Sequence, residues 1–159
     1  MKKTILLIVL ICTSAMLLLG CYGAGGVDNK DKKISVTAPD TKADVFLNID
    51  HVNYEGDSPT LIVRWHNTTR YKVAFGERYA IERLVGDEWI DVGVKDKPFI
   101  EIGLMIEEHS FYEKSYHTDW VDLSKNGTYR LRTSYTLHHD DPDNYKTEDI
   151  FIEFIVSDR

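Results

Sequence analysis

The chain has 159 residues, of which 43% are hydrophobic and 28% are charged, and its formal net charge is -7. This length fits one domain with short flanking segments. Acidic residues outnumber basic ones by 26 to 19, and such a surface repels phosphates, so nucleic acid is not an expected partner. Cys12 and Cys21 are the only cysteines, and their positions exclude a disulfide or a cysteine-based metal site in the body of the chain.

The N-terminus begins with Met1-Lys2-Lys3 and continues as an almost unbroken apolar run of 16 residues, Thr4 to Leu19. A positive start followed by such a run is typical of a secretory signal peptide, which is removed from the mature protein. No Ala-x-Ala site for ordinary cleavage follows the run. We expect a signal peptide at residues 1–20. The alternative is an uncleaved signal anchor, since the run approaches the ~17 residues that just span a bilayer.

The stretch Leu18-Leu19-Gly20-Cys21 resembles the bacterial lipobox, in which the cysteine thiol receives a diacylglyceryl group and becomes the first mature residue. The resemblance implies a lipoprotein whose acyl chains, such as palmitate, hold Cys21 at the extracytoplasmic face of the cell membrane. Two long chains anchor stably because each buried CH₂ contributes ~0.8 kcal/mol. Loss of Lys2 and Lys3 with the signal leaves 17 basic against 26 acidic residues, a balance of -9. Lipid rather than charge must therefore provide the anchor.

Residues 21–42 contain a glycine-rich start, a mixed-charge segment and Thr-Ala-Pro-Asp, with few apolar side chains. This composition is typical of a flexible tether, which would span ~25 Å on average by random-coil scaling. Ile34 and Val36 could still pair as a loose edge strand. The folded domain is expected at residues 43–159.

Short segments with period-two alternation, separated by turn residues, follow from Ala43 onward. Gly86-Asp87 is expected to form a tight hairpin turn, and Asn126-Gly127 a second turn. No segment shows a sustained helical period. These features predict an all-β fold, an antiparallel β-sandwich of about eight strands. The segments with strand character are 45–49, 61–65, 73–75, 79–85, 89–92, 100–106 (weakly alternating), 110–120, 128–137 and 147–156.

The segment Leu123 to Leu131 fits a tyrosine corner. In this motif a tyrosine at the start of a late strand folds back and bonds the backbone a few residues upstream. Tyr129 has that place here. Leu131 stands where antibody domains carry a cysteine, which fits a core without disulfides.

The chain resembles bacterial immunoglobulin-like domains found in lipoproteins and other surface proteins of Gram-positive bacteria. Four segments carry this resemblance in order, namely Trp65–Thr69, Phe75–Glu82, Trp89–Val92 and Leu123–Arg130. The resemblance implies an immunoglobulin-like sandwich outside a Gram-positive plasma membrane. It carries no catalytic residues to this chain.

Structural roles are expected for nine residues of these segments. We expect Trp65 and Trp89 to fill the space between two sheets, Gly76 to permit a backbone bend, and Tyr129 to fix the corner. The alternative for the aromatic side chains is an exposed platform for a sugar or a peptide. The nine residues are Trp65, Asn67, Phe75, Gly76, Tyr79, Trp89, Leu123, Gly127 and Tyr129.

The segment His138 to Asn144 gathers two histidines and three aspartates. Its carboxylates could bind Ca²⁺ and its histidines Zn²⁺. However, adjacent histidines on a strand point apart, the spacing of an EF-hand is missing, and Asp, Pro and Asn are also turn residues. A solvated turn is therefore expected, and no metal or other cofactor.

A second polar set comprises Glu107, Glu108, His109, His117 and Asp119. Glu107 and Glu108 could act as acid and base only in a pocket with partners nearby, so a solvated end of the sandwich is expected. No serine lies in a Gly-x-Ser-x-Gly elbow, and no glycine loop cradles a phosphate. The sequence predicts no catalytic residue.

The function predicted from these observations is a lipid-anchored, non-catalytic binding module for a protein or cell-wall ligand. The loops 53–59, 94–98 and 138–144 are its expected contact surfaces. An envelope proteinase inhibitor is the alternative. An envelope hydrolase is a weaker one, since it would require a concave site with convergent polar groups.

Overall fold

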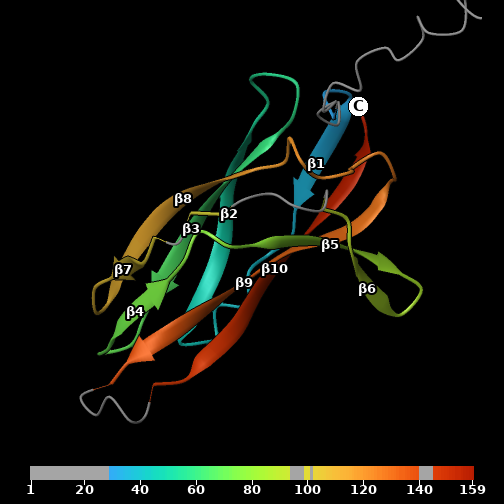
Figure 1. Cartoon of the computed structure of the whole chain (residues 1–159). Coiled ribbons are helices and arrows are strands. Elements are labelled where there is room, and N and C mark those ends of the chain that lie inside the picture. The colour runs from blue at the N-terminus through green and yellow to red at the C-terminus, as the bar shows by residue number, and fades with distance from the viewer. Residues whose placement is uncertain (1–28, 94–98, 101, 140–144) are drawn as a thin grey trace, which may run out of the picture.

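A computed structural model of the chain describes residues 29–93, 99–100, 102–139 and 145–159 (Figure 1). These residues form ten strands, every pairing between them is antiparallel, and none of them is helical. The all-β antiparallel prediction is confirmed, with ten strands where about eight were expected. The strands are β1 (Lys32–Val36), β2 (Val45–Asn53), β3 (Thr60–Asn67), β4 (Lys72–Phe75), β5 (Ala80–Val85), β6 (Glu88–Asp91), β7 (Leu104–Ile106), β8 (Ser110–His117), β9 (Gly127–His138) and β10 (Thr147–Asp158).

The strands form two sheets, one of three strands in the order β2-β3-β8 and one of seven. In the larger sheet β10 lies between β1 and β9, and the long β9 pairs with two strands along its other side. Phe75 of β4 pairs with Tyr135, and Ala80 of β5 pairs with Arg132. Thus β4 and β5 follow one another along the same edge of β9, and β7 and β6 extend the sheet beyond them (Figure 1). Within the described residues, no helix has the length and apolarity needed to cross a bilayer.

Aromatic side chains from both sheets fill the core. Trp65 of β3 is fully buried and stacks on Phe75 of β4, with ring centroids 4.2 Å apart. Its indole Nε1 donates a hydrogen bond of 2.9 Å to the Tyr116 hydroxyl, so the polar edge of the buried ring is satisfied. The alternation predicted for β2 holds as well, since Val45, Leu47 and Ile49 are all buried.

Two turns have the geometry that their residues favour. The Gly86-Asp87 turn joins β5 to β6, with Gly86 at a φ of 63°, where glycine lacks the Cβ clash of other residues. At the start of β9, the buried Tyr129 donates a hydrogen bond of 2.5 Å to the Lys125 carbonyl. This is the backbone contact that a tyrosine corner requires.

The predicted start of the domain at residue 43 is too late. Strand β1 lies inside the segment expected to be a tether and pairs with β10 from Lys32–Asp158 to Val36–Phe154. A strand added to an existing sheet gains backbone hydrogen bonds and needs few apolar side chains. Ile34 is the one buried side chain of β1, and the strand agrees with the edge strand that Ile34 and Val36 were expected to be able to form.

The expectation that Trp89 lies between the sheets is wrong. Trp89 belongs to β6, is only half-buried, and packs under the guanidinium of Arg130 at 4.3 Å from its ring. It pairs with Leu84, whose side chain is exposed. Alternation identifies residues that share one face of a strand, but it does not say which face meets the core.

Gly76 has no structural need to be glycine. Its φ is not positive, and a Cβ built there would approach no atom closer than 3.9 Å. The expected backbone bend therefore tolerates a side chain.

The weak strand predicted at residues 100–106 is shorter in the structure. Among the described residues of this range, Leu104–Ile106 alone form a strand, β7, which pairs with β4. Ile100 and Ile102 are 72% and 48% exposed, so they do not contribute to the core.

Candidate functional site

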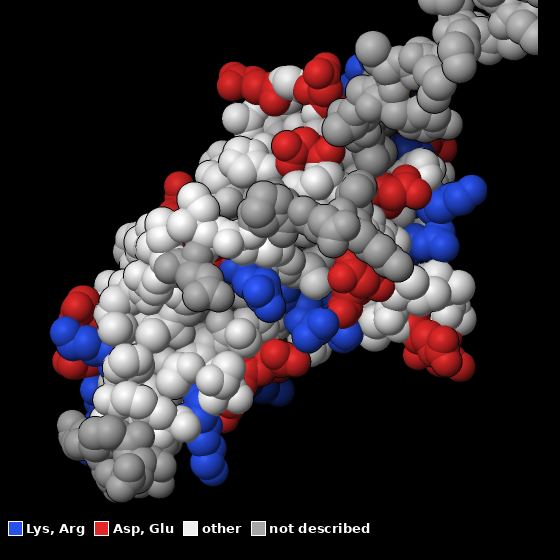
Figure 2. Space-filling model, in the orientation of Figure 1, with Lys and Arg blue, Asp and Glu red and all other residues white. Residues whose placement is uncertain are grey.

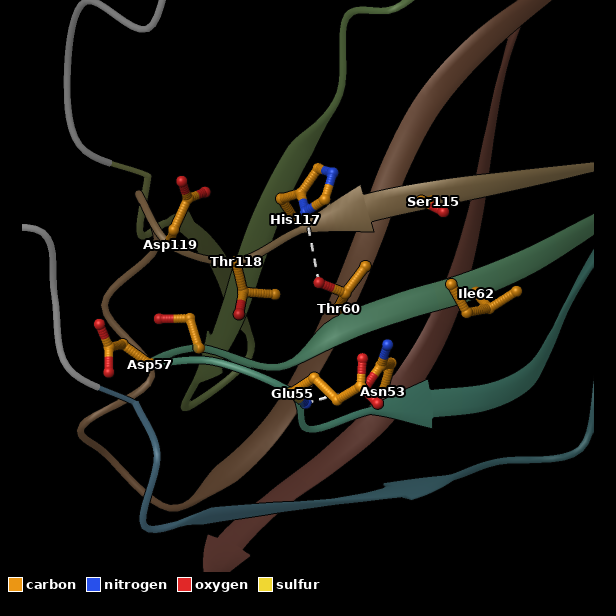
Figure 3. A pocket seen from close by; sticks show the side chains of 10 residues that line it. Asn53, Glu55, Asp57, Thr60, Ile62, Ser115, His117, Thr118 and Asp119 are labelled. Carbon is orange, nitrogen blue, oxygen red and sulfur yellow. Dashed lines mark hydrogen bonds between the residues drawn. The ribbon is translucent and has the colours of Figure 1, made fainter.

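A polar cleft of about 730 Å³ opens at one end of the three-stranded sheet (Figure 3). It lies between the β2–β3 loop, which was one of the expected contact loops, and the end of β8. Figure 3 shows Asp57 and Asp119 at one end of the cleft and Ser115 and Ile62 at the other. The lining residues are Asn53, Glu55, Asp57, Ser58, Thr60, Ile62, Ser115, His117, Thr118 and Asp119.

Strand register holds the two walls of the cleft together. Thr60 pairs with Asn53 on one side and with His117 on the other, and its hydroxyl lies 3.3 Å from His117 Nδ1. The Thr118 hydroxyl donates to the Pro59 carbonyl at 2.5 Å. Gly56, at a φ of 97°, gives the loop a conformation that few other residues adopt. The cleft is therefore a consequence of the sheet and one tight loop.

The cleft has the chemistry of a binding surface. Three carboxylates line it, from Glu55, Asp57 and Asp119, together with hydroxyl groups and no lysine or arginine. Among the lining residues, the Thr60 hydroxyl contacts His117 Nδ1 at 3.3 Å, and this contact links the neighbouring strands β3 and β8. No group of three or more metal-ligating side chains gathers in the described part of the chain. The lining can accept hydrogen bonds from polar or cationic groups.

The second polar set of the sequence is divided by the structure. Glu107, Glu108 and His109 lie at the β7–β8 turn, whereas His117 and Asp119 lie at the far end of β8. His109, directly before β8, and His117 at its end are eight residue steps apart, or about 25 Å at the usual rise. These side chains cannot form one pocket. Lys72 pairs with Glu107 at 2.8 Å, and both side chains are well exposed.

The two histidines before residue 140 face different neighbours. The His138 ring lies 4.6 Å from the Tyr145 ring, and the His139 ring lies 4.3 Å from that of Tyr71. They do not converge on one point. The rest of this expected loop, 140–144, and the loop 94–98 fall outside the described residues.

Asn67, one of the signature residues, links two turns. Its side chain donates to the carbonyls of Tyr71 and Glu107 at 2.7 and 2.9 Å, and its Oδ1 accepts from the Thr69 amide at 3.0 Å. Asn67 is 2% exposed, so these bonds form away from water. The Asn-Thr-Thr turn is therefore structural and fastens the β3–β4 turn to the β7–β8 turn.

Lys114 is a buried charge that the sequence did not reveal. It lies on the inward face of β8, only 7% exposed, between the rings of Phe75 and Tyr116. Its Nζ contacts the Glu77 carboxylate at 2.5 Å. The ion pair and the two aromatic faces compensate the charge within the core.

Charged side chains on the outer face of the larger sheet form a compact network. Glu82 of β5 accepts hydrogen bonds from Arg130 at 2.6 Å and from Arg132 at 2.8 Å. Burial alone would raise the pKa of Glu82, but the two arginine hydrogen bonds outweigh it and lower that pKa below its usual value.

Figure 2 shows one face of the molecule, where acidic and basic side chains are interspersed and no continuous basic patch is present.

The lowered pKa of Glu82 predicts a pH-dependent stability. A carboxyl group whose folded pKa is depressed stabilises the fold above its unfolded pKa, about 4.3, and loses that contribution as pH falls through the folded value. We expect Glu82→Gln to lower the free energy of unfolding by about 2 kcal/mol at pH 7. The deficit should shrink as pH falls below 4.3. Urea unfolding of both proteins across pH 3 to 7 measures it, and a deficit that is the same at every pH would contradict the assignment.

A comparison with protein families decides the relationship that the fold suggests. The family model for the bacterial Ig-like domain matches residues 41–151, which is more than half of the chain. The chain belongs to the bacterial Ig-like domain family. No curated protein matches the chain. The resemblance stated from the sequence is thereby confirmed for the folded part.

Membership indicates a non-catalytic interaction module, because bacterial Ig-like domains are generally non-catalytic and are typically extracellular surface modules. The polar cleft agrees with an interaction module, since its carboxylates and hydroxyls can accept hydrogen bonds from a polar or cationic partner. The matched range begins after β1, which the structure nevertheless places in the Ig-like sheet.

Proposed function

We propose that the protein is a lipid-anchored binding module, held at the extracytoplasmic face of the cell membrane through a diacylglyceryl group on Cys21. Its Ig-like domain would engage a protein or cell-wall ligand. The observation that carries the proposal is the lipobox-like stretch Leu18–Cys21 directly ahead of an Ig-like domain. In such an arrangement the lipid would hold the protein at the membrane and the Ig-like domain would bind the ligand.

The early start of the fold would keep the domain near the bilayer. Asn29 is 1% exposed and is bonded to the loop between β8 and β9. Only eight peptide steps separate it from Cys21, and these reach at most ~29 Å when fully extended. The Asn29 amide also donates to the Asp57 carbonyl, so the polar cleft would lie at the membrane-proximal end. The end of β10 that begins at Thr147 would then point away from the membrane.

Metabolic labelling with an alkyne analogue of palmitate tests the anchor. The wild-type protein should take up the label and stay in the membrane fraction after a high-salt wash, and detergent should release it. Cys21→Ser should take up no label. Cys12→Ser is the matched control, because it removes the other thiol of the chain and should label as the wild type does. Label on the Cys21→Ser protein, or extraction of the wild type by salt, would contradict the proposal.

A further inference from the structure

Strand β10 has a free edge along half of its length. The strand runs from Thr147 to Asp158 and pairs with β9 from Thr147 to Val156. On its other side β1 pairs only with Phe154 to Asp158. Within the described residues, no strand lies beside the preceding segment Thr147–Glu153 on that side.

The direction of the free backbone groups follows from two bonds at the covered end. The Arg159 amide donates to the Asp31 carbonyl, and the Glu153 carbonyl accepts from the Thr37 hydroxyl at 2.5 Å. Odd-numbered residues of β10 therefore point their backbone groups toward β1. The β9–β10 register has no bulge, so Asp149 and Phe151 point theirs the same way, where β1 has already ended. An amide and a carbonyl of each residue are available to a further strand.

The neighbouring edge is protected, in contrast. β1 is the outermost strand of its sheet, and the Tyr54 hydroxyl covers its outer side by accepting from the Ile34 amide at 2.7 Å. Side-chain caps of this kind limit pairing with other chains at a sheet edge. On the open part of β10 the Thr37 hydroxyl covers the Glu153 carbonyl, and among the described residues no side-chain cap lies on the backbone groups of Asp149 or Phe151.

A groove of about 480 Å³ runs along this open edge, between β10, the β1–β2 loop and the start of β2. Its apolar lining includes Pro39, Val45 and Phe151. Four carboxylates also line it, from Asp40, Glu148, Asp149 and Glu153, and no lysine or arginine does. Arg132 pairs with Asp149 at 3.2 Å from outside the lining, which leaves an excess of negative charge.

We propose that this groove binds an extended, cationic peptide segment, which adds to β10 as a strand in line with β1. Backbone bonds to Asp149 and Phe151 would supply affinity, and the groove would select alternating apolar and basic side chains. The proposal rests on the binding function proposed above and names its partner class and surface. Charge complementarity chooses the occupant, because lysine or arginine side chains would meet the four carboxylates.

Two other occupants fit less well. A second copy of the chain pairing through the same edge would bring the carboxylates of Glu148, Asp149 and Glu153 in the two copies close together, and like charges across paired strands are destabilising. The preceding segment Cys21–Asp28 contains no lysine or arginine. It also joins the domain at the opposite end of β1 from the groove.

Fluorescence polarisation with a fluorescein-labelled decapeptide of alternating lysine and valine tests the proposal, using the full chain in detergent. We expect saturable binding that falls with salt. A peptide with glutamate for lysine, and one with proline at alternate positions, should bind at least tenfold more weakly. Proline at alternate positions removes backbone amide donors that a paired strand needs, whereas most of the positive charge of the peptide stays. Binding of the label to detergent alone serves as the blank.

Two variants at one position separate the backbone contact from the charge. Asp149→Ala removes the carboxylate and should weaken binding about threefold. Asp149→Pro also removes the groove-facing amide, near the start of β10, and should weaken binding at least tenfold. Circular dichroism checks that both variants fold. If the proline variant does not fold, Glu153→Lys is used, and its reversed charge should weaken binding at least tenfold.

Hydrogen exchange locates the peptide. Protection on binding should appear in residues 147–153. Equal affinity of the alanine and proline variants, binding of the glutamate peptide as tight as that of the lysine peptide, or protection confined to another segment would overturn the proposal. Self-association of the chain through residues 147–153 would also overturn it. Absence of lipid on Cys21 would overturn the anchor and leave the peptide result unchanged, so the two proposals fail separately.

Discussion

Trp65→Ala is expected to lower the free energy of unfolding by about 4 kcal/mol. The residue is fully buried and stacks on Phe75 across the two sheets. Its removal would leave a large cavity, and the buried Tyr116 hydroxyl would lose its indole donor. Urea unfolding followed by circular dichroism measures the loss.

Trp89→Ala is the matched control for this prediction. The same residue type is lost from a half-buried position on the outer face, where Trp89 contacts the Arg130 guanidinium. An exposed contact of this kind contributes about 1 kcal/mol. Equal losses for the two variants would contradict the placement of Trp65 in the core and of Trp89 outside it.

Asn29→Ala is expected to lower the free energy of unfolding by about 3 kcal/mol, although Asn29 lies in a segment whose composition suggests a tether. Its Nδ2 donates to the carbonyls of Thr118 and Val121 at 3.1 and 2.9 Å, and its Oδ1 accepts from the Leu123 amide at 3.2 Å. Asn29→Ala would leave these three buried backbone groups without their hydrogen-bond partner, and unpaired buried polar groups carry the full cost of desolvation.

The control for Asn29 is Lys33→Ala at an exposed position of β1, which should change the free energy of unfolding by less than about 0.5 kcal/mol. The same urea titration serves for both variants. A loss at Asn29 as small as that at Lys33 would show that the domain begins later than the structure places it. We also expect Asn29→Asp to be less stable than the wild type, because a carboxylate cannot donate the two hydrogen bonds that the Asn29 amide donates.

Local alternation was sufficient to predict the central strands. Leu61, Val63 and Trp65 occur at every second position and are all buried in β3, because a half-buried strand exposes alternate side chains to the core. The Gly86-Asp87 turn was predictable for a similar reason, since its backbone geometry depends on residues next to one another.

Long-range contacts explain the features that the sequence did not reveal. The sequence allowed an edge strand at Ile34 but did not identify its partner β10, which lies more than a hundred residues away. Lys114 occupies an inward position because Glu77 meets it from another part of the chain. Trp89 shares its period with core strands, but the hairpin turns its ring outward. No local pattern contains these partners.

The candidate surfaces divide in the same way. The turn residues of 53–59 indicated a loop, and this loop lines the polar cleft. The free edge of β10 follows from the short length of β1, which is a property of the folded sheet and not of the β10 sequence. The sequence therefore indicated the loop of the polar cleft but not the free edge of β10.

Mass spectrometry of the N-terminal peptide of the native protein tests the central claim most directly. The account predicts a chain that starts at Cys21 and carries a diacylglyceryl group on that side chain. A free Cys21 thiol, or a chain that starts at Met1, would contradict it.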